Sequence, residues 1–192
     1  PETALEEGAL AAKLPLSVDH REDLRHLPIV AIDPADARDH DDAIWAEPDG
    51  EGGFRAIVAI ADVSLYVRPG GDLDREARKR GNSVYFPDRV VPMLPEVLSA
   101  DVCSLKQGVD RAAMACHLRI SPEGKVTKFR FTRALVRIAA NTAYEDAQAS
   151  IDYGTAPEHL ANLWAAWKLL AADRAARDPL ERRLPRVPAA DL

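Results

Sequence analysis

The sequence predicts an α+β fold in which a mixed, largely antiparallel β-sheet forms the core and helices flank it. Residues 54–61 are the most continuous apolar run and predict a central buried strand. Residues 126–138 alternate Phe129 and Phe131 with basic or polar side chains, which predicts a strand with one buried face. After residue 142 the apolar spacing becomes helical, which predicts the flanking helices.

Shorter segments complete the expected sheet. Residues 27–33, 43–47 and 112–120 predict three further strands. The turn-rich segments 48–53 and 121–125 predict hairpin connections. We expect residues 84–86 to be extended and residues 93–98, which lie between prolines, to form a loop with a short helical turn.

Capping signals delimit the expected helices. A short charged helix is predicted at residues 73–80, with Asp72 as its N-cap. Thr142 and Glu145 have the spacing of a capping box at the start of another helix. Pro157 opens a long helix rich in Ala and Leu that runs to about Arg177. The chain is thus expected to divide into an extended lead-in (1–26), a folded domain (27–178) and a disordered tail (179–192).

Composition restricts the class of protein. The chain has 192 residues and 47% hydrophobic content, which suits one domain or a large fragment of one. It contains no run of 18 apolar residues and no signal peptide at its start, so no membrane association is expected and a cytoplasmic location is the default. Cys103 and Cys116 match no metal motif and are expected to be small apolar residues.

The net charge of −6 argues against a generic nucleic-acid-binding module, which would usually be basic. An enzyme with an acidic metal site that acts on nucleic acid remains compatible with this charge. Basic side chains also gather in two groups, either of which could face a phosphate backbone or be simply solvated. The first group contains Arg75, Arg78, Lys79, Arg80 and Arg89, and the second contains Lys125, Lys128, Arg130, Arg133 and Arg137.

The most informative motif is an acidic run at residues 33–42. Its carboxylates are Asp33, Asp36, Asp39, Asp41 and Asp42. Like charges crowded into a folded domain repel, and a divalent cation is the simplest partner for them. Hard cations such as Mg²⁺ take oxygen ligands. Because a predicted strand lies on each side, the loop would be a rigid mount, which favours metal-assisted chemistry on a phosphate.

Two alternatives compete with this interpretation. The run could be a solvated acidic loop that binds nothing. A calcium-binding EF-hand loop is excluded by pattern, because a loop starting at Asp39 would place Ala43 and Ile44 where a ligand and a glycine are required.

Residues 32–43 resemble the catalytic signature of the ribonuclease II / ribonuclease R (RNB) family of 3′-to-5′ exoribonucleases. Residues 59–64, 81–95, 98–99 and 103–105 are similar to later stretches of the same domain in the same order. The similarity covers roughly residues 25–175, and the acidic loop itself looks nearer to the ribonuclease R branch.

The resemblance implies a processive, two-metal hydrolysis of single-stranded RNA to nucleoside 5′-monophosphates, with Mg²⁺ as cofactor and Mn²⁺ as the alternative. The implied catalytic and metal-binding carboxylates are Asp33, Asp39, Asp41 and Asp42. Tyr85 matches an aromatic that stacks on the 3′-terminal base, and Tyr144 matches an aromatic linked to preference for RNA over DNA; for both, ordinary packing is the alternative.

Asp36 is expected to shape the turn. The implied partners are single-stranded RNA and RNA-degradation machinery, and the chain is expected to be monomeric.

The chain departs from the family pattern at its ends. Full-length relatives carry OB folds on both sides of this region and a later arginine-rich helix that grips phosphates. We therefore expect the chain to be the N-terminal half of an RNB catalytic domain, and a non-catalytic RNA- or protein-binding remnant is the alternative. A metal-dependent phosphatase or nuclease of another fold is a third hypothesis, which product analysis would separate from the first.

Overall fold

The computed structural model describes residues 1–177. Its centre is a seven-stranded sheet in the order β1-β8-β7-β4-β3-β2-β9, in which β1–β8 and β2–β9 are parallel pairs and the other pairs are antiparallel. The strands are β1 (Glu22–Asp23), β2 (Val30–Asp33), β3 (Asp42–Pro48), β4 (Phe54–Ala61), β7 (Asp110–Ile120), β8 (Val126–Arg137) and β9 (Ala140–Ala143). The predicted mixed, largely antiparallel sheet is confirmed, and β4 is its central strand.

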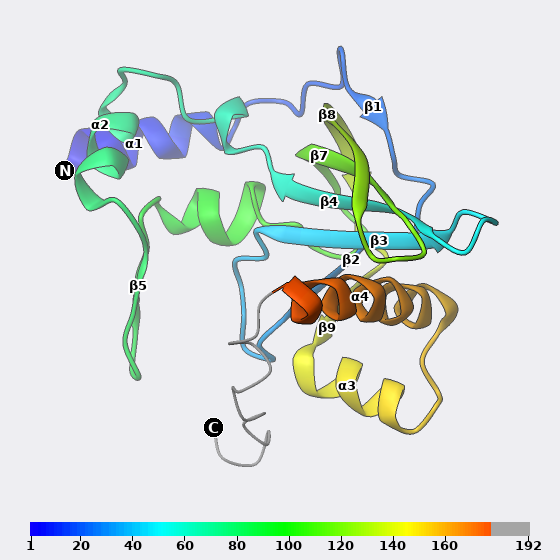
Figure 1. Cartoon of the computed structure of the whole chain (residues 1–192). Helices are drawn as coiled ribbons and strands as arrows, with labels where there is room; N and C mark the ends of the chain where they lie inside the picture. The colour runs from blue at the N-terminus through cyan, green and yellow to red at the C-terminus, as the bar shows by residue number, and fades with distance from the viewer. Residues whose placement is uncertain (178–192) are drawn as a thin grey trace.

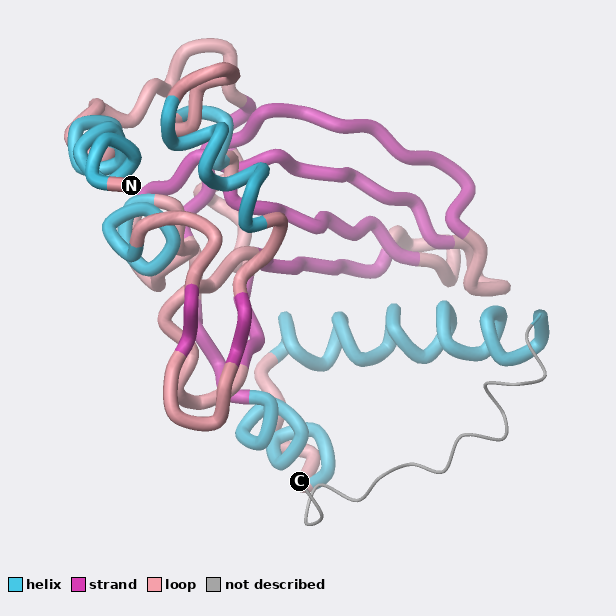
Figure 2. The backbone as a smooth tube through the Cα atoms, turned by 90° about the vertical axis from the view of Figure 1, so that its left-hand side faces the viewer, coloured by secondary structure: helices cyan, strands magenta, loops and turns pink. Residues whose placement is uncertain are grey.

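Helices flank this sheet, as Figure 1 shows. The helix α4 runs beneath β3, and α1 lies beside α2 near the N-terminus. The helices are α1 (Glu2–Ala11), α2 (Asp72–Arg80), α3 (Tyr144–Asp152) and α4 (Glu158–Arg177), with short helical turns η1 (Val63–Leu65) and η2 (Leu98–Val102). A separate hairpin pairs β5 (Val84–Tyr85) with β6 (Val90–Val91) and projects from the body of the molecule in Figure 2.

Two apolar clusters pack on opposite faces of the sheet. Side chains alternate between faces along each strand, so Trp45 and Ala46 of β3 belong to different layers. Trp45 joins the larger cluster with Ile57, while Ala46 joins a smaller cluster with Ala166 of α4. The sheet is therefore covered by α4 on one face and by N-terminal and loop segments on the other.

Several expectations about local structure were wrong. Residues 1–26 are not an extended lead-in, because α1 forms there. Gly71, not Asp72, is the N-cap of α2. The capping box at Thr142 is absent, because Thr142 pairs with Ile32 in the sheet and α3 begins only at Tyr144.

The expected burial of one face of residues 126–138 also fails at its outer end. Phe129 and Phe131 are 69% and 65% exposed, because α4 covers only the part of that face nearer β3. The predicted tail at residues 179–192 lies outside the described residues. Within the described part, no helix is long and apolar enough to cross a membrane.

Candidate active site

The acidic loop is anchored at both ends by strands of the sheet. Asp33 is the last residue of β2, and Asp42 is the first residue of β3. Close to β3, the backbone oxygen of Asp41 accepts a hydrogen bond of 2.9 Å from the amide of Ala61 at the end of β4. The strands therefore fix the two ends of the loop, as the sequence predicts.

A second segment holds the middle of the loop. The hydroxyl of Ser104 donates to the backbone oxygen of Arg38 at 3.0 Å and accepts from the amide of His40 at 3.1 Å. The amide of Leu105 donates to the backbone oxygen of His40 at 2.8 Å. Ser104 is fully buried, so water does not compete for these bonds and the loop has a fixed backbone path.

Two carboxylates of the loop, those of Asp33 and Asp39, each lie within hydrogen-bond distance of another side chain. Nδ1 of His40 lies 2.6 Å from Oδ2 of Asp33. The phenol of Tyr85, the last residue of β5, donates to Oδ2 of Asp39 at 2.9 Å. The hairpin thus brings an exposed aromatic ring from a separate sheet directly to the acidic loop.

The other two carboxylates, Asp41 and Asp42, have little positive charge nearby to compensate their own. The pKa of Asp41 is raised, first because surrounding protein displaces water and then because Asp39, Asp42 and Asp33 repel its charge; His40 opposes the shift. The pKa of Asp42 is raised by loss of water and by Asp33. The pKa of Tyr85 is raised mainly because its hydroxyl hydrogen-bonds to the Asp39 carboxylate. Mutual repulsion shows that the four carboxylates form one electrostatic cluster.

The donor chemistry of this cluster fits a hard divalent cation, since carboxylate oxygens are its preferred ligands. The side chains are not arranged as a finished cage: within residues 1–177, no three His, Cys, Asp or Glu side chains converge as a group that could hold a metal ion. One oxygen of Asp33 and one of Asp39 already bond to His40 and Tyr85. The assignment of these four carboxylates as metal ligands therefore stays a prediction.

The two tyrosines and Asp36 occupy different positions around the cluster. Tyr144 begins α3 immediately after Ala143, which is the register partner of Asp33 across the β2–β9 pair. Tyr85 and Tyr144 are 64% and 54% exposed, so neither is an ordinary core residue. Asp36 is exposed in the turn after Pro34. The fold thus places both tyrosines near the carboxylates.

Comparison with known proteins assigns the family. The model of the family described as "RNB domain" matches residues 21–185. The chain belongs to the RNB domain family. Ribonuclease R of Vibrio parahaemolyticus is 47% identical over 169 residues, which are 84% of this chain and 20% of that protein. Ribonuclease R of Escherichia coli K12 is 47% identical over 165 residues, 82% of this chain and 20% of that protein. The chain thus spans about a fifth of the length of these relatives.

Solved RNB structures share the fold. RNase R of Mycoplasma genitalium in complex with ribose-methylated single-stranded RNA superposes with a TM-score of 0.80 at 29% identity, covering 90% of this chain and 28% of the other. Yeast Ssd1, a pseudonuclease, shares the fold with a TM-score of 0.74 at 20% identity over 86% of this chain and 21% of its own. Because an RNB fold also occurs in a pseudonuclease, the site residues and not the fold must carry any argument for catalysis.

His40 and Ser104 are site residues that the sequence reasoning did not assign. His40 lies within the acidic run, so a titratable ring between two carboxylates was a visible signal. Ser104 lies more than sixty residues downstream, and only the fold brings its hydroxyl to the acidic loop. Both residues fix the geometry of the carboxylates.

Proposed function

We propose that this chain is the carboxylate-bearing part of a metal-dependent, processive 3′-to-5′ exoribonuclease that hydrolyses single-stranded RNA to nucleoside 5′-monophosphates. The observation that carries the proposal is the cluster of Asp33, Asp39, Asp41 and Asp42, in which loss of water and then charge repulsion raise the pKa of Asp41 and Asp42. Relatives named ribonuclease R, at 47% identity, support the reaction class.

The carboxylates would hold Mg²⁺, or Mn²⁺ in its place. Bound in a two-metal arrangement, such ions supply a water-derived nucleophile and stabilise the leaving oxygen. The protein's own part is to place the acids. His40 orients Asp33, Tyr85 orients Asp39, and the Ser104 hydroxyl keeps the intervening backbone in one path.

The two exposed tyrosines are proposed to select and hold the substrate. The ring of Tyr85 would stack on the 3′-terminal base, because an aromatic face binds any base and suits an enzyme without sequence preference. Tyr144, beside Asp33, would contact the ribose region and favour RNA over DNA. We propose that the chain acts as a monomer with RNA-degradation machinery in a reducing compartment such as the cytoplasm, in keeping with its free cysteines Cys103 and Cys116.

The test uses single-stranded RNA labelled at its internal phosphates, so that released mononucleotides carry the label, incubated with the chain and Mg²⁺. Full-length ribonuclease R from Escherichia coli serves as the active reference, and the Asp41→Asn variant serves as the inactive one. Release of nucleoside 5′-monophosphates from the 3′ end, abolished by EDTA and by Asp41→Asn, is the expected result. Internal cleavage or release of inorganic phosphate alone would contradict the proposal.

A non-catalytic RNA-binding role is the second candidate. It is favoured by the absence, within residues 1–177, of three converging metal-ligand side chains. The same assay separates the two: retention of labelled RNA on the chain without any mononucleotide release, at all Mg²⁺ and Mn²⁺ concentrations, would support binding alone.

A further inference from the structure

A cavity lies on the sheet face opposite α4, away from the acidic loop. Its volume is about 580 Å³, which is the size of a small-molecule site. Its apolar lining includes Trp45 and Ile57, which we call the floor, and Leu24 and Leu27 from the segment after β1. None of the residues that line the cavity belongs to the acidic loop, so it is separate from the proposed catalytic cluster.

Two cross-strand rows of side chains build the cavity, because register partners on neighbouring strands lie on the same face. The inner row consists of Trp45, Ile57, His117 and Arg130. The outer row consists of Glu47, Arg55, Arg119 and Lys128. The outer row therefore places three cations side by side on β4, β7 and β8, with a single acid at its end.

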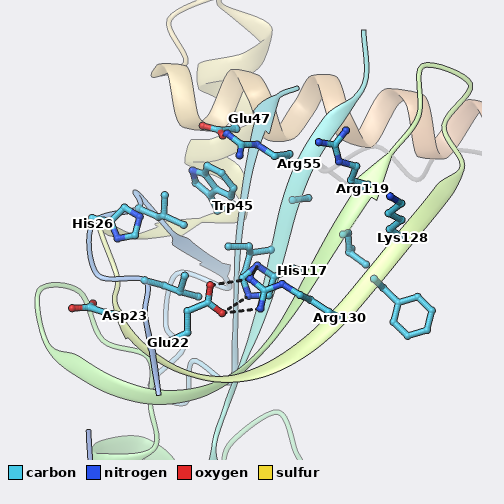
Figure 3. Close-up of a pocket in the computed structure, with 16 residues that line it drawn as sticks. Glu22, Asp23, His26, Trp45, Glu47, Arg55, His117, Arg119, Lys128 and Arg130 are labelled. Carbon is cyan, nitrogen blue, oxygen red and sulfur yellow. Dashed lines mark hydrogen bonds and ion pairs between the residues drawn. The ribbon is translucent and has the colours of Figure 1, made fainter. Parts of the chain in front are cut away.

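Most cations of the two rows have a partner. Arg130 makes two hydrogen bonds to Glu22, at 3.0 and 2.9 Å, and His117 lies 3.2 Å from the same carboxylate; Figure 3 marks these contacts. In the outer row, Arg55 forms an ion pair with Glu47. Their charges are therefore already compensated within the protein.

Arg119 and Lys128 are the least compensated cations of the outer row, because the ion pairs of Arg119 are long and Lys128 is exposed. Arg119 reaches Asp49 and Glu51 only at 3.8 and 3.9 Å, and its side chain is 48% exposed. Among the described residues, no carboxylate forms an ion pair with the exposed Lys128. The two residues are direct register partners, and like charges placed directly opposite destabilise a sheet. An anion bound between them would relieve this repulsion.

We propose that this cavity is a second nucleotide-binding site, which takes a segment of single-stranded RNA with its phosphate between Arg119 and Lys128 and its base against the apolar floor. Arginine and lysine neutralise backbone phosphates without reading sequence. Most of Trp45 and Ile57 is buried in the core, so a base would contact only the edges of these side chains that line the cavity. The choice of RNA as ligand rests on the proposed function, whereas the half-exposed Arg119 and the exposed Lys128 on neighbouring strands do not.

The test measures the fluorescence anisotropy of a labelled single-stranded RNA in EDTA, so that binding is observed without hydrolysis. The double variant Arg119→Ala/Lys128→Ala is compared with Lys168→Ala/Arg177→Ala, which removes the same two residue types from exposed positions of α4 on the opposite face. Thermal unfolding checks that both variants fold. Arg119→Lys/Lys128→Arg, which keeps both charges, should bind like the parent chain.

We expect the cavity variant to lose about 10-fold in affinity and the slope of log K against log salt to fall by about 1.4, the value for two phosphate contacts on a single strand. Equal losses in the cavity and control variants would overturn the site, because they would report net charge only. Competition by adenosine 5′-monophosphate supports a nucleotide site. Competition by polyglutamate as strong as that by RNA would overturn the nucleotide assignment.

The Mg²⁺ hydrolysis assay is run on the same variants. If the parent chain releases no mononucleotides, the proposed function is contradicted. If the cavity variant nevertheless binds RNA more weakly than the parent chain, the second site is left intact. Release of mononucleotides by the cavity variant at the parent rate, together with an RNA affinity equal to that of the parent chain, would overturn the second site and leave the proposed function intact.

Discussion

Asp41 and Asp62 lie at neighbouring strand ends but in opposite electrostatic environments. The amide of Ala61, the residue before Asp62, donates to the backbone oxygen of Asp41. Asp62 is buried and pairs with Arg21 at 2.8 Å, and the hydroxyl of Ser64 donates to its second oxygen at 2.6 Å. Burial alone would raise the pKa of Asp62, but these two hydrogen bonds lower it below its ordinary value.

Asp41 has no comparable compensation. Loss of water and three neighbouring carboxylates raise its pKa, and only His40 acts in the opposite direction. One strand end therefore holds a carboxylate whose charge is satisfied by the protein, and the next holds a carboxylate whose charge is largely uncompensated. The first arrangement serves stability, and the second is typical of a functional site.

The largest expected effect is on stability, from Asp62→Ala. The variant leaves the Arg21 guanidinium, whose side chain is 3% exposed, without its partner. Breaking a buried pair in this way costs about 3–5 kcal/mol of unfolding free energy. Urea unfolding measures the loss. Asp88→Ala, which removes the exposed partner of Arg89, is the matched control and should cost under about 1 kcal/mol. Similar losses in both variants would contradict the distinction between them.

The same pair predicts the direction of a pH effect. Because the pKa of Asp62 is lower in the folded state than in the unfolded chain, the stabilisation by the pair is complete above the unfolded value. It is lost as the pH falls through the folded value. In acid, the difference in stability between the parent chain and Asp62→Ala should therefore shrink.

Asp41→Asn should have the next largest effect, on rate and not on stability. Loss of one charged oxygen donor in the cluster is expected to reduce hydrolysis on the order of 10²-fold or more, while removal of a repelled carboxylate leaves folding intact. Single-turnover hydrolysis and urea unfolding on the same preparation measure the two quantities. Parent-like rates in the variant would show that Asp41 is not part of the catalytic machinery.

Tyr85→Ala should weaken the hold on the 3′-terminal nucleotide and leave the chemistry in place. The ring is exposed and bonded to Asp39, and the loss of one base stack costs roughly 1–3 kcal/mol. The shortest RNAs should suffer most, which a ladder of product lengths would show. Tyr153→Ala, another exposed tyrosine, is the control. An unchanged ladder together with a lower unfolding temperature would make Tyr85 a structural residue.

Asp36→Ala should have the smallest effect. Asp36 is an exposed turn residue, and surface substitutions of this kind usually change stability by less than about 0.5 kcal/mol. Hydrolysis rates should stay close to those of the parent chain, whereas Asp33→Ala should lose most activity. Equal losses at the two positions, measured in one assay, would place Asp36 among the acids that act on the substrate.

Local patterns in the sequence were enough to predict the central strand β4, the long helix α4 and an acidic loop between two strands. Each of these elements has a period or a set of turn residues that its neighbours in sequence supply. The helix α1 was missed because the residues that it buries, Ala4, Gly8 and Ala11, are all small. Gly8 packs close to Pro95, where a Cβ would lie 3.1 Å from the proline ring. A helix that buries small residues has little hydrophobic periodicity to detect.

The sequence by itself determined which residues carry negative charge at the site, since five aspartates fall within residues 33–42. Only the tertiary structure decided what each charge meets. It brings Ser104 and Tyr85 to the acidic loop, gives Asp62 the partner that Asp41 lacks, and aligns Arg119 with Lys128 across two strands. The reason is physical: charge is a property of one residue, whereas compensation depends on groups that are distant in sequence and meet only when the sheet forms.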